Sequence, residues 1–392
     1  MIASLIVLAQ LGTAQANPTP EITEYPSPKQ EAIAIEAIID LPKLNPAQRY
    51  VLSQAMTVAV QMTNEYGNRD VLRVLQTGTR FRLFQAADHL RIGLTVDNDQ
   101  LSAGLSLLHS VLTQPTFLAE TIKVRKSAWS DPWSPAYSGF ESQEIPLNRE
   151  DIVALWQGVV KSKSISLAVS GDFRAGVPTQ KWRAMPSGWG AVVPDRLPLA
   201  FPPKMKQVEN SVPLLIFDSK PITITRANMA SYFLAANALG VGKDSILWIA
   251  AREEMNLSYR QESFLLPTEA GWKMRMAFAT DEDGKKPETI AALRTKLRAR
   301  CEAFSQADLD HAIGLGKGYL QNQIPTLPLV LGIGDTASFD SNDQLYLKHY
   351  WGTHFGFIWD TENLYDQMKS TSLADLKKLL VQLVDESSVR IL

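Results

Sequence analysis

Cysteine and histidine are both scarce in this sequence. Its 392 residues include one cysteine, Cys301, and five histidines, at positions 89, 109, 311, 349 and 354. A disulfide within the chain is therefore impossible, and so is a zinc site built from several cysteines. The position of the histidines matters as much as their number, because no residue before His89 can supply an imidazole ligand.

An excess of one charge and long apolar runs are also missing. Lys and Arg number 39 against 41 Asp and Glu, which leaves a formal net charge of -2. Such a balance gives no basic surface for nucleic acid and no polybasic patch for a membrane. No stretch reaches the roughly 18 apolar residues that a membrane-spanning helix requires. We therefore expect neither a nucleic-acid partner nor a membrane span.

The composition is that of a folded protein with more than one domain. Apolar residues make up 45% of the chain and charged residues 20%. These are ordinary values for globular proteins, and they exclude disorder as the dominant character. At about 150 residues per domain, the length predicts two or three domains.

The amino terminus has the pattern of an export signal. Residues 2–11 form a short apolar run, and Ala14 and Ala16 have the spacing that signal peptidase prefers. We expect residues 1–16 to be a signal peptide and the protein to be exported, to the periplasm or the extracellular space. No Lys or Arg precedes the run, so a frayed apolar strand is the alternative. Four prolines within residues 17–29 predict a linker there.

The order of the predicted elements repeats along the chain. Hydrophobic periodicity predicts strands at 30–41, 90–96, 165–170, 211–217, 273–280 and 389–392, and helices at 47–62, 98–112, 118–127, 147–160, 244–255, 287–303, 306–320 and 373–384. Ser372 and Asp375 predict a capping box for the last helix. Both halves thus follow one plan, which indicates a duplicated α+β domain, at 30–173 and 210–392. The proline-rich segment 174–209 is the predicted linker between the two domains.

One segment carries a resemblance to a known family. Residues 244–259 read Asp-Ser-Ile-Leu-Trp-Ile-Ala-Ala-Arg-Glu-Glu-Met-Asn-Leu-Ser-Tyr. This run is similar to the second-domain signature of the insulinase/pitrilysin zinc peptidases, a helix that ends in Arg-Glu-x-x-Gly-Leu-x-Tyr. Asn256 stands where glycine is usual. Because Asn accepts a left-handed conformation better than most residues, the helix can still end there.

Weaker similarities to the same family follow in the family's order. They lie at residues 107–117, 148–172 and 308–312, so the resemblance covers roughly residues 30–330. It implies an α+β fold of two tandem homologous domains, each a mostly antiparallel sheet covered by helices.

The zinc motif of this family is absent from the chain. Family members that cut peptides carry His-x-x-Glu-His on an early helix of the first domain, where zinc holds a water and the Glu acts as its base. The family spacing places this motif near Leu52-Ser-Gln-Ala-Met56, where none of the three side chains occurs. Gln54 is a poor ligand and a poor base. We therefore expect no catalytic and no metal-binding residue here, and the resemblance implies that zinc belongs to a partner subunit.

Two residues of the family signature remain. In two-subunit relatives, the metal-free subunit supplies an arginine and a tyrosine from its second domain to the partner's active site. Arg252 and Tyr259 match these positions and are the candidate substrate-binding residues. A guanidinium and a phenol are suitable donors to a substrate carbonyl or a developing oxyanion. Alternatively, Arg252 caps its own helix and Tyr259 begins a strand.

The histidines and the cysteine are interpreted as structural. His89 is expected to form an ion pair with Asp88, and His349 and His354 are expected in a solvent-facing or packed aromatic cluster. His109, His311 and Cys301 are also assigned structural roles, with Cys301 as a small buried residue.

These observations lead to one main hypothesis. The resemblance implies a non-catalytic, substrate-binding subunit of a heterodimeric zinc metallopeptidase that acts on peptides, with catalysis supplied by a homologous partner. Two alternatives stay open: a structural scaffold subunit of a larger complex, and a peptide-binding protein that acts alone.

Overall fold

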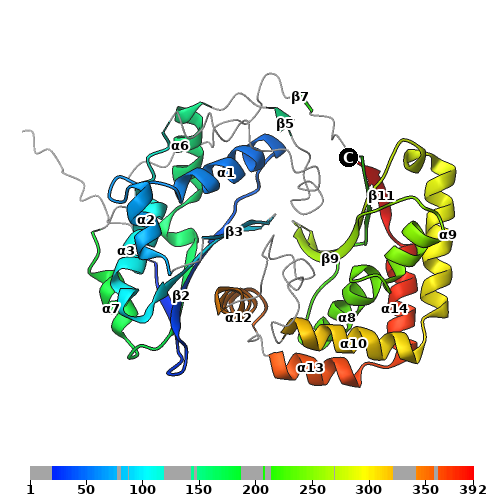
Figure 1. Ribbon diagram of the computed structural model, residues 1–392. Helices are drawn as coiled ribbons and strands as arrows, with labels where there is room; N and C mark the ends of the chain where they lie inside the picture. Colours follow the sequence, from blue (N-terminus) through cyan, green and yellow to red (C-terminus); the bar gives the residue numbers. More distant parts are fainter. Residues whose placement is uncertain are drawn as a thin grey trace, which may run out of the picture.

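Two α+β lobes, with one helix between them, make up the molecule. The computed structural model describes residues 20–76, 81–86, 88–118, 143–144, 148–186, 206–207, 213–268, 270–320, 341–356 and 361–392. Figure 1 shows the first lobe in blue to green and the second in green to red. The predicted signal peptide at 1–16 and most of the predicted helix at 118–127 lie outside the described residues.

The first lobe is built on a five-stranded sheet. Its strands lie in the order β1 (Ile22–Pro26), β6 (Ile165–Gly171), β2 (Ala32–Asp40), β4 (His89–Asp97) and β3 (Arg82–Gln85). All neighbours are antiparallel except β1 and β6, which run parallel. Along β2 and β4, one alternate set of side chains is aliphatic and enters the core beneath the helices, while the opposite face is mixed.

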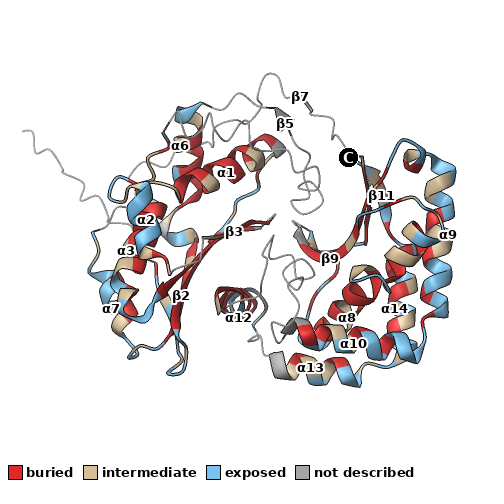
Figure 2. Cartoon of the chain, viewed as in Figure 1, coloured by how far each residue is buried: buried red, intermediate tan, exposed pale blue. Residues whose placement is uncertain are grey.

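Helices cover the aliphatic face of this sheet. They are α1 (Pro46–Ala59), α2 (Asn68–Val74), α3 (Leu101–Thr113), α6 (Arg149–Val159) and α7 (Val177–Arg183). Asn45 and Gln48 form a capping box at the start of α1, and Asn148 caps α6 by accepting from the Asp151 amide. Figure 2 shows that the buried sides of the helices face the sheet.

The second lobe repeats the topology of the first. Its four strands lie in the order β11 (Ser388–Ile391), β8 (Leu214–Asp218), β10 (Gly271–Ala279) and β9 (Gln261–Thr268), all antiparallel. When β1 is left aside, the first sheet has the order β6, β2, β4, β3, which are the last, first, third and second of its strands along the chain. The second sheet, β11, β8, β10, β9, has the same order. The predicted α+β fold of two similar domains with antiparallel sheets is confirmed.

The second lobe contains its predicted helices and two further ones, at 229–240 and 361–370, that hydrophobic periodicity did not predict. They are α8 (Met229–Gly240), a π-helix (Trp248–Glu253), α9 (Pro287–Ala303), α10 (Gln306–Leu320), α13 (Thr361–Ser370) and α14 (Leu373–Asp385). Ser372 caps α14 by accepting from the Asp375 amide, as predicted. Among the described residues, no helix has both the length and the hydropathy needed to cross a bilayer.

The structure changes the interpretation of both predicted linkers. Within residues 17–29, the segment Ile22–Pro26 forms β1 and pairs with β6. Proline is tolerated there because β1 is an edge strand. Within residues 174–209, Val177–Arg183 forms α7, whose Trp182 is buried in the first core. Proline content alone was therefore a poor guide to where the folded lobes begin and end.

Helix α12 (Ser341–Phe355) joins the two lobes. It lies beyond α10 in the chain, yet it packs on β2, β4 and β6 of the first sheet and lies between the lobes in Figure 1. Leu345 packs against Ala34 and Ala168 of that sheet. On another side of the helix, the Trp351 ring stacks on Trp272 of β10, with the centroids 5.0 Å apart.

A buried ion network anchors α12 to the first sheet. The Nη2 atom of Arg91, on β4, lies 2.7 Å from Oε1 of Glu36, on β2. Its Nη1 atom lies 2.7 Å from Oδ1 of Asp343, on α12, and all three side chains are buried. The Asn342 amide donates to Glu36 Oε1 at 3.2 Å, and the Arg91 guanidinium lies 4.5 Å above the Tyr346 ring. One cation thus serves two carboxylates from two segments that are far apart in the sequence.

Burial dominates the electrostatics of Glu36. It raises the pKa of Glu36 to about 7; Arg91 opposes this rise and the charge of Asp343 adds to it. A Cβ atom on the neighbouring Gly93 would collide with the Glu36 carboxylate, so glycine gives this carboxylate its space.

Replacing Arg91 should be strongly destabilising. We expect Arg91→Met to lower the free energy of unfolding by about 3–5 kcal/mol, because it removes the buried cation that pairs with both carboxylates. Urea denaturation measures this loss. The triple variant Arg91→Met, Glu36→Gln, Asp343→Asn is the control and should recover most of it. A loss below about 1 kcal/mol in the single variant would contradict the role assigned to the network.

Glu36 should also make stability depend on pH. Its pKa is about 7 in the folded protein against an ordinary value of 4.5, so between these values the folded state holds a proton that the unfolded state releases. The contribution to stability is therefore fully present below about 4.5 and is lost as the pH rises through about 7.

Comparison with Glu36→Gln isolates this effect. The difference in the free energy of unfolding between wild type and variant should shift against the wild type as the pH rises, by at most about 1.4 kcal/mol per pH unit. Burial lowers the pKa of His349 to about 4, so His349 makes the stability rise with pH. Its contribution is the same in wild type and variant and cancels in the difference between them. A difference that stays constant with pH would show that Glu36 does not titrate in this range.

Candidate functional site

The helix that would hold zinc in the related peptidases is closely packed here. Leu52, Ala55 and Met56 of α1 belong to the first core, and Ser53 donates a hydrogen bond to the Tyr50 carbonyl at 2.8 Å. Gln54 is also buried, and its Nε2 atom has no hydrogen-bond partner among the residues that the structure describes. In the part of the chain that the structure describes, no group of three or more His, Cys, Asp or Glu could hold a metal ion. The absence of a metal from the functional protein stays a prediction.

The structure brings Arg252 and Tyr259 together. The Cζ atom of Arg252 lies 3.4 Å from the centroid of the Tyr259 ring, a cation–π contact. The Arg252 side chain is half-buried, whereas Tyr259 is 73% exposed. Nη1 of Arg252 donates a hydrogen bond to Oδ1 of Asn256 at 2.6 Å. The two predicted residues therefore form one surface site, and Asn256 is a third member that the sequence did not reveal as such.

A π-helix sets the position of Arg252. The Glu254 amide donates to the Ile249 carbonyl at 3.0 Å, five residues back, and the Leu257 amide donates to the Ala251 carbonyl at 2.7 Å. π-helical turns are rare and occur frequently at functional sites. Asn256 then has a φ of 50°, the left-handed conformation that ends many helices. The expectation that Asn can replace glycine at this position is confirmed.

Ser258 fixes the chain that leads to Tyr259. It is buried, and its Oγ lies 2.8 Å from the Arg260 carbonyl and 2.6 Å from the Ala279 carbonyl, to which it donates. Strand β9 begins at Gln261, two residues after Tyr259, so Tyr259 precedes the strand instead of opening it. The bonded partner of Arg252 is a side chain rather than a helix carbonyl. The substrate role of the pair stays a prediction.

The histidines take structural positions. His89 pairs with Asp88 at 2.8 Å, as predicted, and its Nε2 lies 2.7 Å from the Tyr346 hydroxyl of α12. His89 and Tyr346 of this Asp–His–Tyr chain are buried, whereas Asp88 is partly exposed, and burial raises the pKa of Tyr346 well above its usual value. The predicted aromatic cluster around His354 is packed: its ring lies 4.3 Å from that of Tyr350.

The other single residues also have ordinary environments. His109 is buried with its ring edge-on to Trp182, with the centroids 5.4 Å apart. His311 is exposed, 3.7 Å from Asp244. Cys301 is buried, and this burial raises the pKa of its thiol to about 12, so the thiolate that a reactive cysteine needs is not formed near neutral pH.

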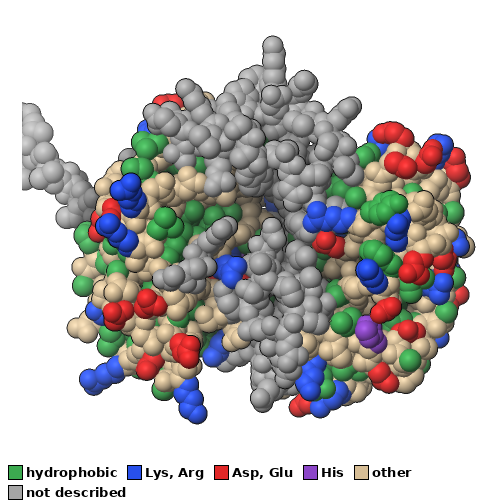
Figure 3. Space-filling model, viewed as in Figure 1, with side chains coloured by type: hydrophobic (Ala, Val, Ile, Leu, Met, Phe, Trp, Pro, Cys, Tyr) green, Lys and Arg blue, Asp and Glu red, His purple; other side chains and the backbone are tan. Residues whose placement is uncertain are grey.

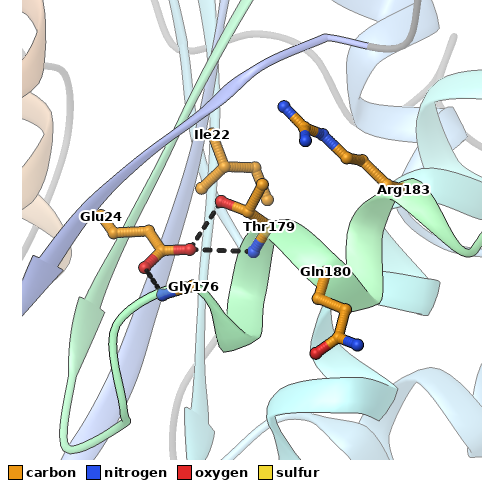
Figure 4. Close-up of a pocket in the computed structure, with 6 residues that line it drawn as sticks. All are labelled: Ile22, Glu24, Gly176, Thr179, Gln180 and Arg183. Carbon is orange, nitrogen blue, oxygen red and sulfur yellow. Dashed lines mark hydrogen bonds between the residues drawn. The ribbon is translucent and has the colours of Figure 1, made fainter.

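A surface hollow lies between β1 and α7, and backbone amides that line it are bonded by a side chain of the protein itself. It has a volume of about 590 Å³ and is lined by Ile22, Glu24, Gly176, Thr179, Gln180 and Arg183 (Figure 4). Glu24 accepts from the Gly176 amide at 2.6 Å and from the Thr179 amide at 2.9 Å. The carboxylate thus takes the place that an external anion would occupy, and it fastens β1 to α7.

Comparisons with known proteins agree with this architecture. No protein-family model and no curated protein matches the sequence. A peptidase M16 inactive domain from Pseudomonas fluorescens shares the fold, with a TM-score of 0.62, 14% identity and 95% of each chain covered. A protease from Helicobacter pylori has a TM-score of 0.64 and 13% identity, over 96% of this chain and 98% of the other.

A predicted insulinase family protease from Yersinia pestis is a further match. It has a TM-score of 0.53 and 13% identity, with 99% of this chain and 95% of the other covered. At these identities the likeness is one of fold, and it extends over both lobes. The chain therefore has the fold of the insulinase-type M16 peptidases.

Proposed function

We propose that this chain is the non-catalytic, substrate-binding subunit of a heterodimeric zinc peptidase. A homologous partner would hold the zinc, its water and the general base. The observation that carries the proposal is the assembled, solvent-facing pair of Arg252 and Tyr259 on a chain whose α1 has no histidine. The name of the similar Pseudomonas fluorescens structure, an inactive M16 domain, supports it.

The chemistry of the pair suits binding better than bond cleavage. The contact with the Tyr259 ring restrains the Arg252 guanidinium, whose N–H donors point outward within its own plane. The Tyr259 hydroxyl adds a donor on an exposed side chain. Such donors hold a peptide carbonyl, or stabilise an oxyanion, in an active site that another subunit completes.

Export of the protein belongs to the same proposal. A periplasmic or extracellular location is supported by the signal-peptide pattern of residues 1–16. Peptides are the proposed substrates, and the partner is a second two-lobed chain of the same fold that carries an intact zinc motif.

The isolated chain should be free of zinc and inactive. We expect less than about 0.1 zinc per chain after dialysis, because none of the family's ligands is present near Gln54. Elemental analysis by mass spectrometry measures the metal, and a quenched-fluorescence peptide library measures cleavage. One zinc retained per chain, or cleavage that a chelator abolishes, would refute this part of the proposal.

The reconstituted complex should depend on Arg252. We expect Arg252→Ala to lower kcat/KM of the mixed complex by about 10- to 100-fold, the loss typical of a hydrogen bond from a charged donor. Arg226→Ala, which removes an exposed arginine of the same lobe, is the matched control and should leave kcat/KM unchanged. If the two variants have equal activity, Arg252 does not contact substrate.

A further inference from the structure

Arg252 carries a charge that its surroundings leave unneutralised. Among the residues that the structure describes, it contacts the Asn256 amide and the Tyr259 ring, and none offers it a carboxylate. The carboxylates that are close to Arg252 in the sequence have partners of their own. Glu254 pairs with Lys296 at 2.8 Å and with Arg300, Glu262 pairs with Arg260 at 3.3 Å, and Glu253 accepts from the Trp248 indole at 3.2 Å.

Glu254 is neutralised by two cations of α9. Hydrogen bonds from Lys296 and Arg300 of α9 lower the pKa of Glu254, so it stays ionised and paired with these two cations. Acidic side chains are thus interspersed with basic ones on the second lobe, as Figure 3 shows for the face in view. Within the described part of the chain, the guanidinium of Arg252 therefore has no anionic partner.

Tyr259 and Asn256 determine which N–H donors of the Arg252 guanidinium are accessible to a ligand. Tyr259 covers one face of the plane, and Asn256 takes one N–H of Nη1. The donors that remain lie along the other edges of a plane whose orientation is set. A guanidinium edge offers two parallel N–H groups, which match the two oxygens of a carboxylate and exceed what one carbonyl oxygen accepts.

We propose that Arg252, Tyr259 and Asn256 form a carboxylate-recognition site that selects peptides with an acidic group at the bound position. The ligand is a carboxylate, from an Asp or Glu side chain or from a free peptide C-terminus. Arg252 and Tyr259 contact it, and Asn256 is a positioning residue that acts through Arg252. This inference rests on the proposed function for its context, but direct binding to the isolated chain tests it.

The backbone conformation of Asn256 allows a variant that removes only its side-chain amide. Its left-handed backbone is equally accessible to glycine, so Asn256→Gly removes the amide without straining the chain. The variant therefore separates the hydrogen bond from the helix end. With the amide gone, we expect the guanidinium to spend less time over the Tyr259 ring.

The test uses three matched peptides and the full chain labelled with [15N]arginine. The probes are an N-acetylated, C-amidated Gly/Ser/Ala decapeptide with one central Glu, its Gln counterpart, and the Gln peptide with a free C-terminal carboxylate. Chemical-shift titration of the Arg252 Nε–H signal, assigned by its loss in Arg252→Lys, gives each affinity. We expect the Glu peptide, the free-carboxylate peptide or both to bind about five- to tenfold tighter than the amidated Gln peptide. The source with the larger preference is the group recognised.

Variants then show which residues are responsible for the preference for a carboxylate. A titration followed by backbone signals should show the preference falling to about one- to twofold in Arg252→Lys, which keeps the charge but loses the planar fork. Asn256→Gly should give an intermediate preference, and the ring-current shift of the Arg252 side chain should decrease. Arg226→Ala should keep the full preference. Equal affinities for all three peptides in the wild type, or a full preference in Arg252→Lys, would overturn the carboxylate site. An unchanged ring-current shift in Asn256→Gly would overturn the role of Asn256.

Failure of this inference differs from failure of the proposed function. If Arg252→Ala inactivates the mixed complex while the peptides bind alike, Arg252 binds a neutral carbonyl and the carboxylate inference is wrong. If the peptides are discriminated while the complex is insensitive to Arg252→Ala, the carboxylate site stands and the role in a peptidase is wrong.

Discussion

The ion network around Arg91 is the interaction on which the arrangement of the two lobes depends. A buried guanidinium is tolerated where counter-charges meet it in a fixed geometry, and here they come from β2 and from α12. A shift of α12 by one turn would separate Asp343 from Arg91 and remove one of the two carboxylates that neutralise this buried cation. Hydrophobic contacts alone impose no comparable restriction, because apolar side chains can repack against one another. The network therefore selects one position of α12.

That position determines how the lobes lie relative to each other. Side chains on two sides of α12 reach different sheets: Leu345 packs on the first sheet, and Trp351 stacks on Trp272 of the second. Ile38 of β2 accordingly belongs to the same buried cluster as the core of the second lobe. The role proposed for Arg252 and Tyr259 at a partner's active centre would require this rigidity, since donors misplaced by about 1 Å lose much of their effect.

Local signals predicted several helices well but missed others, among them α2, α7, α8 and α13. The predicted bounds of α9 and α10 agree with the structure, because periodicity and N-terminal proline are properties of the segments themselves. Helix α12 was missed because its polar residues are buried in the network, so no amphipathic pattern marks it. Strand β9 was missed because burial on both faces removes alternation. Long-range contacts decide both elements, and single-sequence patterns do not contain them.

The candidate site shows the same division between local and long-range information. A family resemblance was enough to single out Arg252 and Tyr259, but their contact depends on a π-helix and on a left-handed residue that no periodicity reveals. In the sequence, Asn256 stands where the family usually has glycine. In the structure it keeps the conformation that glycine provides and adds an amide that holds the guanidinium. A departure from a family pattern at a helix end is therefore a place to look for a specific contact, because glycine at that position contributes backbone freedom and no side chain.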